Sequence, residues 1–228
     1  MPVTLAFDVY GTLIDTHGVV EKLQWMVGDK ARAFSQSWRD KQLEYTFRRG
    51  LMQMYDDFSV CTRDALNYTC ARYGAPLSDS QKQELLNVYR TLPAFDDVRE
   101  GLGLLSGAGY GLFAFSNGSA EAVKTLLVAA DIDSYFLDVI SVEDIRSFKP
   151  NPAVYSHFLR RSHSSGGDAW LVSSNPFDVI GAISAGMHGI WLQRSQDQIY
   201  DPWGVEPTIT ISSLRELEGQ LARFHSTR

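Results

Sequence analysis

Polar side chains that could carry out nucleophilic chemistry follow several short apolar runs of this 228-residue sequence. Asp8 comes directly after the run Val3–Phe7, and Lys149 follows a later run with a short loop between them. The other polar residues at such places are Thr12, Ser116, Asn117, Ser173, Asn175 and Asp178, and Gly118 adds a backbone N–H group. A carboxylate beside an ammonium group can attack an electrophilic centre, and hydroxyl, amide and backbone N–H groups can bind an anion. Helix capping explains Ser119, but it does not explain an aspartate and a lysine at two strand ends.

The elements that would position these side chains alternate between short strands and helices. The expected strands are Val3–Phe7, Gly111–Phe115, Asp138–Ser141, Trp170–Val172, Gly189–Leu192 and Thr208–Ile211. The expected helices are Val98–Ser106, Ala120–Ala129, Pro152–Arg160, Phe177–Ala185 and Leu214–Phe224. This alternation predicts an α/β fold with a doubly wound parallel sheet, whose strands end at the edge where ligands bind.

A helical block separates the first strand from the rest of the predicted sheet. From Gly18 to about Tyr89 apolar residues recur at helical spacing, which indicates roughly four helices. We therefore expect a core domain of residues 1–14 and 94–228, with a helical cap domain of residues 15–93 inserted after the first strand.

Composition excludes several classes of protein. Hydrophobic residues make up 44% and charged residues 21% of the chain, as in ordinary globular proteins. The net charge of −6, with both signs interleaved, argues against nucleic acid as a partner. No stretch is long and apolar enough to span a membrane, and the first residues do not resemble a signal peptide. Cys61 and Cys70 lack the spacing of a metal site, so we expect buried thiols and a cytoplasmic protein.

Four segments of the chain resemble the motifs of the haloacid dehalogenase superfamily, which has a Rossmann-like core. They are Phe7-Asp8-Val9-Tyr10-Gly11-Thr12-Leu13, Ser116-Asn117-Gly118, Lys149-Pro150 and Ser173-Ser174-Asn175-Pro176-Phe177-Asp178. The cap segment 38–46 and the sequence around Lys149 and Tyr155 are similar to the bacterial L-2-haloacid dehalogenases in particular. The resemblance runs from about residue 3 to residue 214.

Tyr10 separates two activities within this superfamily. Phosphatases that share the motifs carry an aspartate at this position as general acid and base, and they bind magnesium partly through an acidic fourth motif. Here Tyr10 and Asn175 stand where acidic groups would be needed, so a magnesium site is not expected. Displacement of halide from a neutral carbon requires neither group. A phosphatase or phosphomutase is the alternative, and a non-catalytic relative that binds small carboxylates is a second one.

The resemblance implies a cofactor-independent hydrolysis of short (S)-2-haloacids to (R)-2-hydroxy acids. Asp8 would attack the α-carbon, with the ammonium of Lys149 stabilising its carboxylate. Ser116 and the backbone N–H groups after it would bind the substrate carboxylate. Water would then hydrolyse the ester, with Asp178, Ser173 and Asn175 positioning or deprotonating it and with Thr12 and Lys149 stabilising the oxyanion.

Further residues are assigned by the same resemblance. Arg39 from the cap would face the halide or the carboxylate, and the sequence does not decide between these two anions. Tyr155 joins the site, although packing on a helix face would also explain it. The apolar wall of the pocket would be formed by Tyr10, Leu43, Phe58 and Phe177. The resemblance also implies a homodimer, for which the apolar stretch Leu43–Met54 offers a surface.

Overall fold

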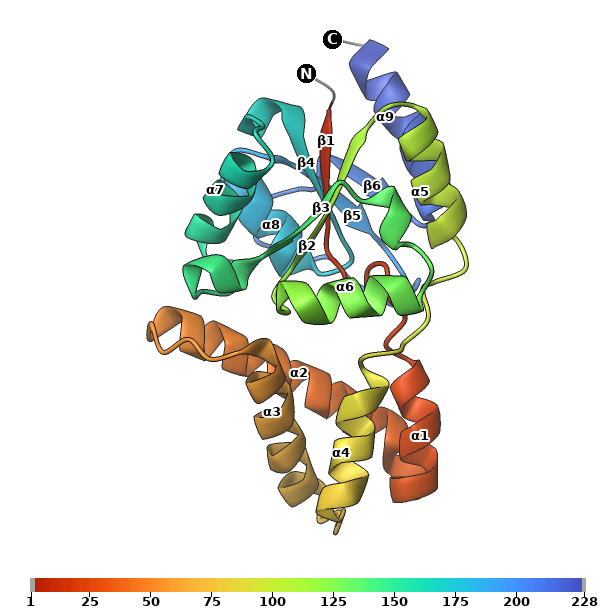
Figure 1. Cartoon of the computed structure of the whole chain (residues 1–228), viewed down its shortest axis with the longest axis vertical. Helices are drawn as coiled ribbons and strands as arrows, with labels where there is room; N and C mark the ends of the chain where they lie inside the picture. The colour runs from red at the N-terminus through yellow and green to blue at the C-terminus, as the bar shows by residue number, and fades with distance from the viewer. Residues whose placement is uncertain (1–2, 227–228) are drawn as a thin grey trace.

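Six parallel strands form the sheet at the centre of the computed structural model, which describes residues 3–226 (Figure 1). The strands are β1 (Thr4–Phe7), β2 (Gly111–Ser116), β3 (Asp138–Ser141), β4 (Ala169–Ser173), β5 (His188–Leu192) and β6 (Ile209–Ile211). Their order is β3-β2-β1-β4-β5-β6, so β1 lies between β2 and β4. This order places the residues that follow β1, β2 and β4 side by side, and it confirms the predicted doubly wound sheet.

Helices cover both faces of the sheet because alternate strand residues point to opposite sides. One apolar cluster joins Leu5 and Phe7 of β1 to α5 (Val98–Gly107), α6 (Ala120–Ala129) and α9 (Leu217–Ser226). The other joins Ala6 to α7 (Pro152–Arg161) and α8 (Pro176–Ser184). Figure 1 shows α5 and α9 on one side of the sheet and α7 and α8 on the other.

The helical cap lies beyond the edge at which β1 and β2 end (Figure 1). It contains α1 (Gly18–Val27), a 3₁₀ turn (Gly28–Lys30), α2 (Ala31–Leu51), α3 (Phe58–Tyr73) and α4 (Asp79–Val88). The fully buried Trp38 of α2 packs in its interior, and its indole Nε1 donates to the Thr62 carbonyl of α3 at 2.8 Å. The predicted helical block of roughly four helices is therefore confirmed.

Two chain segments connect the cap to the sheet, and they run next to each other. The Asp15 amide donates to the Pro93 carbonyl at 2.8 Å, and the Phe95 amide donates to the Leu13 carbonyl at 3.0 Å. Ile14 and Ala94 also form an antiparallel bridge. These paired backbones fix where the cap is attached relative to the end of β1.

The last predicted helix, Leu214–Phe224, was wrong in its first turn. Leu214–Glu216 is a 3₁₀ turn, and α9 begins at Leu217. The Ser213 side chain accepts the Arg215 amide, and the Glu216 side chain accepts the Ser213 amide, so this short turn has its own cap. Other 3₁₀ turns, at Asp133–Tyr135, Val142–Ile145 and Gly166–Asp168, are too short for periodicity to predict.

Burial of the thiols agrees with the sequence, since Cys61 and Cys70 are both free and buried. Within residues 3–226, no helix has the length and apolar character that crossing a membrane requires.

Candidate active site

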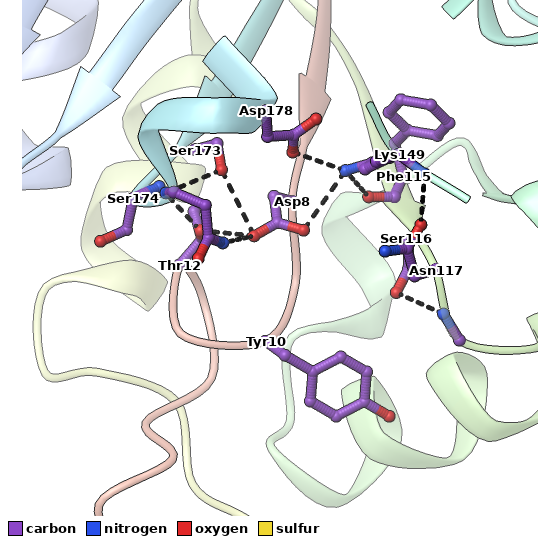
Figure 2. Close-up of polar contacts among 12 residues, drawn as sticks. Asp8, Tyr10, Thr12, Phe115, Ser116, Asn117, Lys149, Ser173, Ser174 and Asp178 are labelled. Carbon is purple, nitrogen blue, oxygen red and sulfur yellow. Dashed lines mark hydrogen bonds and ion pairs between the residues drawn. The ribbon is translucent and has the colours of Figure 1, made fainter. Parts of the chain in front are cut away.

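Asp8 lies just past the end of β1, where its backbone amide continues the sheet by donating to the Val172 carbonyl at 3.0 Å. Its two carboxylate oxygens differ in their surroundings (Figure 2). Oδ2 accepts hydrogen bonds from Thr12 Oγ1 at 2.8 Å, Asn175 Nδ2 at 2.9 Å and Ser173 Oγ at 3.4 Å. Among the described residues Oδ1 accepts from Lys149 Nζ alone, at 3.3 Å. One oxygen is thus held by three donors, while the other keeps a lone pair for reaction.

Lys149 reaches Asp8 from the loop between the 3₁₀ turn at Val142–Ile145 and α7. Its side chain is 2% exposed, and its ammonium donates to Asp178 Oδ2 at 2.8 Å and to the Phe115 carbonyl at 2.9 Å. The same nitrogen lies 4.2 Å from the centre of the Phe115 ring. A buried ammonium held between two carboxylates compensates the charges of both.

Asp178 comes from the first turn of α8 and is fully buried behind Lys149. The phenolic hydroxyl of Tyr155 donates to its other oxygen, Oδ1, at 2.8 Å. Burial raises the pKa of Asp178, and the charge of Asp8 adds to the rise, while the contacts with Lys149 and Tyr155 oppose it. Burial, followed by the charge of Asp178, raises the pKa of Tyr155 well above its ordinary value, so this hydroxyl stays protonated and donates.

Tyr155 can approach Asp178 because α8 has a glycine opposite it. A Cβ atom on Gly181 would lie 2.4 Å from the Tyr155 hydroxyl and 2.9 Å from Pro150 Cβ. Nothing in the sequence distinguished Gly181, since glycines within helices have many causes. Packing on a helix face was the other explanation for Tyr155. Its hydroxyl donates to Asp178, which packing alone does not explain.

The residues that follow β2 form a side of the site rich in hydrogen-bonding groups. The Asn117 side-chain oxygen accepts the Lys149 amide at 2.9 Å, which ties this loop to the lysine (Figure 2). Ser116 Oγ accepts the Gly118 amide at 3.1 Å, and the Gly118 carbonyl accepts from Ser141 Oγ at 2.8 Å. Ser119 caps α6 by accepting the Ala122 amide, as expected for a helix cap.

Arg39 brings a positive charge from the cap to the same place. Its guanidinium donates from Nη1 to Gln42 Oε1 at 2.7 Å and from Nη2 to the Tyr10 carbonyl at 3.4 Å. Gln42 is in turn held by Thr62, which accepts from its Nε2 at 2.6 Å. The neighbouring Asp40 accepts from Gln36 at 2.8 Å, while Arg39 binds Gln42 and Tyr10. Gln42 was not predicted, although its position three residues after Arg39 on a helix was a signal.

A small cavity of about 10 Å³ lies between the cap and the end of the sheet. It is lined by Asp8, Tyr10, Arg39, Leu43, Phe58, Ser116, Asn117, Lys149, Asn175 and Phe177. All four predicted wall residues therefore surround it. Thr12, Tyr155, Ser173 and Asp178 lie behind Asp8 and Lys149 instead, and Gly118 lines a larger neighbouring cleft that shares Tyr10 and Phe58 with the cavity.

The surroundings of Asp8 do not suit the magnesium ion of phosphatases. Its carboxylate faces two N–H donors, from Asn175 and Lys149, where a cation would need oxygen ligands. The Tyr10 ring is turned away from that carboxylate (Figure 2). Across residues 3–226, no three His, Cys, Asp or Glu side chains gather in an arrangement that could hold a metal ion.

Comparisons with known proteins agree with this arrangement. Residues 3–186 match the family model described as a haloacid dehalogenase-like hydrolase. An (S)-2-haloacid dehalogenase of Pseudomonas putida is 35% identical over 217 residues, which cover 95% of each chain. Haloacetate dehalogenase H-2 of Moraxella sp. (strain B) is 35% identical over 207 residues, covering 91% of this chain and 92% of the relative.

Solved structures give the same result. The L-2-haloacid dehalogenase of Xanthobacter autotrophicus with chloropropionic acid covalently bound superimposes with a TM-score of 0.90. Its sequence is 28% identical, and the match covers 98% of this chain and 99% of the other. The chain belongs to the haloacid dehalogenase-like hydrolase family, and its similarity within that family is to the (S)-2-haloacid dehalogenases.

Proposed function

We propose that the protein hydrolyses short (S)-2-haloacids to (R)-2-hydroxy acids, with inversion, through an ester formed on Asp8. The unequal surroundings of the two Asp8 oxygens carry this proposal. The relatives named above act on haloacids by their names, and one solved relative holds chloropropionic acid covalently. Both support the same reaction for this chain.

In the first step Oδ1 of Asp8 attacks the α-carbon, and the carbon–halogen bond breaks with its electron pair leaving on the halide. Oδ1 is suited to this because Lys149 Nζ, at 3.3 Å, is its sole donor among residues 3–226. Attack from the side opposite the halogen inverts the carbon. The product of this step is an ester in which Oδ2 remains the carbonyl oxygen.

In the second step water adds to the carbonyl carbon of that ester, and negative charge develops on Oδ2. Thr12, Ser173 and Asn175 already donate to this oxygen, so they are in place to stabilise the oxyanion. Asp178 is the base that accepts the proton of the water, and the raised pKa of its carboxyl suits that role. The tetrahedral intermediate then collapses, and the leaving alkoxide takes a proton from Lys149, which regains one from the protonated Asp178, so that the 2-hydroxy acid is released.

The substrate is held by groups that line the cavity. Ser116, Asn117 and the backbone N–H groups before α6 bind the carboxylate, while Tyr10, Leu43, Phe58 and Phe177 enclose the carbon chain. Arg39 faces an anion, which is either the departing halide or the carboxylate. The small size of the cavity favours short substrates.

We also propose the division into a core of residues 1–14 and 94–228 and a cap of residues 15–93. The paired segments at Asp15–Pro93 and Leu13–Phe95 support boundaries at these positions.

A homodimer formed through the stretch Leu43–Met54 belongs to the same proposal. At the end of α2, Leu51 is 86% exposed and Met54, just beyond it, is 61% exposed, which suits an interface. The cytoplasmic location stays a prediction.

A single turnover in heavy-oxygen water, with enzyme in excess, tests the chemistry. If Asp8 is the nucleophile, the hydroxyl oxygen of the first product comes from its own carboxylate, and the solvent oxygen remains on Asp8. We therefore expect unlabelled 2-hydroxy acid and a labelled peptide that contains Asp8. Labelled product in the first turnover would show that water attacks the substrate directly.

A further inference from the structure

Arg194 is a mostly buried cation that the reaction described above does not use. It follows β5, and its side chain is 11% exposed. Its guanidinium donates to the Thr12 carbonyl from Nε at 3.0 Å and from Nη2 at 2.6 Å. It also stacks on Phe95, with its central carbon 4.1 Å from the centre of the ring. The contact with Thr12 places this arginine directly behind the turn that carries the nucleophile.

Asp97 holds the guanidinium in this position. Arg194 Nη1 donates to Asp97 Oδ1 at 2.7 Å, while Oδ2 of Asp97 accepts the Leu214 amide at 2.6 Å and Ser213 Oγ at 3.0 Å. Each carboxylate oxygen therefore has donors, and the arginine fork is fixed on both sides. A lysine could not reproduce this geometry, because its single nitrogen cannot make the parallel contacts of a planar guanidinium.

Gln198 makes a second connection from the same segment of the chain. Its side-chain oxygen accepts the Arg194 amide at 3.3 Å, and its Nε2 donates to the Ser174 carbonyl at 2.7 Å. Ser174 lies between Ser173 and Asn175, which both donate to Asp8 Oδ2. Its amide donates to Thr12 Oγ1 at 2.9 Å (Figure 2).

These contacts converge on one atom of the site, Oδ2 of Asp8. Thr12 is held by its carbonyl at Arg194 and by its hydroxyl at the Ser174 amide, and that hydroxyl donates to Asp8 Oδ2. The Ser174 loop, which supplies the other two donors, is held by Gln198. All three groups that stabilise the oxyanion in the proposed second step therefore depend on one supporting pair, Arg194 and Gln198.

We infer that Arg194 and Gln198 are positioning residues that align the three donors to Asp8 Oδ2 for hydrolysis of the ester. This inference rests on the proposed function and adds to it a second layer of residues that touches no substrate. During attack by Oδ1 no negative charge develops on Oδ2, so the first step does not need these three donors to stabilise an oxyanion. Loss of the supporting pair should therefore slow ester hydrolysis more than halide displacement.

The test uses Arg194→Ala, Arg194→Lys and Gln198→Ala, with Arg215→Ala as the matched control. Arg215 also lies next to this region, where it pairs with Glu100 and donates to the Asp96 carbonyl, but it does not contact the nucleophile turn. For the two Arg194 variants we expect kcat to fall on the order of 100-fold, as misplacement of a reacting group does. The kcat/KM value, which reports steps up to halide displacement, should fall much less.

Ester on Asp8 should accumulate in these variants, as seen by intact mass during turnover, and guanidinium ion at millimolar concentration should partly restore kcat of Arg194→Ala. Gln198→Ala, which buries no unpaired charge, should show the same direction with a smaller effect. Equal losses of kcat and kcat/KM without ester, or wild-type kinetics in all three variants, would overturn the inference.

Backbone hydrogen exchange separates this inference from the proposed function. Amides of the segments 8–14 and 173–175 should exchange faster in the Arg194 and Gln198 variants than in the Arg215 control. If the wild type released no halide from any haloacid, the proposed function would fail. Hydrogen exchange would then be the remaining test of whether Arg194 and Gln198 position these segments. Unchanged exchange in these segments would refute it in either case.

Discussion

Replacement of Asp178 by asparagine should stop the reaction halfway. The amide cannot accept the proton of the attacking water, so hydrolysis should slow by the 10²–10⁴-fold that general bases contribute, or about 3–5 kcal/mol. Asp178 is fully buried and accepts from Lys149 at 2.8 Å and from Tyr155 at 2.8 Å. The single oxygen of an asparagine can serve one of these donors, and its NH₂ group then faces the other.

Halide displacement should suffer far less. Lys149 keeps its contact with Asp8 and with the Phe115 carbonyl, so the variant loses about one hydrogen bond near the nucleophile. A loss of about 1 kcal/mol corresponds to less than a tenfold change in rate. The ratio of the two steps therefore changes by one to three orders of magnitude, roughly, and the ester should become the main form of the enzyme.

Rapid-quench measurement of halide, with intact mass in parallel, gives the result directly. We expect a burst of one halide per active site, followed by slow turnover, and an enzyme mass increased by the carboxyalkyl group of the substrate. Asp144→Asn is the control, because this carboxylate binds His157 and Arg161 away from the cavity. Steady turnover without a burst, or no halide release at all, would show that Asp178 is not confined to the second step.

Four further results are expected. Tyr155→Phe removes a hydrogen bond that lowers the pKa of Asp178, so the acidic limb of the kcat profile should move to higher pH, since the base must be ionised; an unmoved limb would separate Tyr155 from the base. Excess chelator should leave activity unchanged, and a loss that magnesium restores would overturn the metal-independent chemistry. Gly181→Ala should destabilise the fold by about 1–3 kcal/mol through the 2.4 Å approach to Tyr155, lowering the melting temperature by several degrees in calorimetry, whereas Gly107→Ala, which has open space, should not. Light scattering at micromolar concentration should give the mass of a dimer, and a monomer would contradict the interface at Leu43–Met54.

Much of the site could be predicted because its residues follow strands of a parallel sheet. Asp8, Ser116 and Ser173 each come at or directly after the end of a strand, and sheet order alone brings such positions together. Lys149 is further along its loop, but an isolated lysine after an apolar run was a signal. The same reasoning gave the strands to within about two residues, since short buried runs have few alternatives.

The supporting residues could not be predicted, because their partners are backbone atoms far away in the sequence. Arg194 binds the Thr12 carbonyl, 182 residues earlier, and a carbonyl leaves no trace in the sequence. Gly181 is required by a clash that exists only when α7 and α8 are packed together. The 3₁₀ turn before α9 was misread because its apolar residues continue the helical spacing, while the local capping at Ser213 ends it.

The division of labour between sheet and cap has a consequence for how new specificities arise. Among residues 3–226, the side chains that donate to the Asp8 carboxylate come from the core, whereas Arg39, Leu43 and Phe58 of the cavity wall come from the inserted helices. Part of the substrate pocket is thus encoded in a stretch of the gene separate from the bond-breaking groups. Variation confined to codons 43–58 can enlarge or reshape the pocket around the carbon chain of the substrate while the nucleophile and its donors are inherited intact. Selection for an unfamiliar haloacid therefore has a route that need not pass through inactive intermediates.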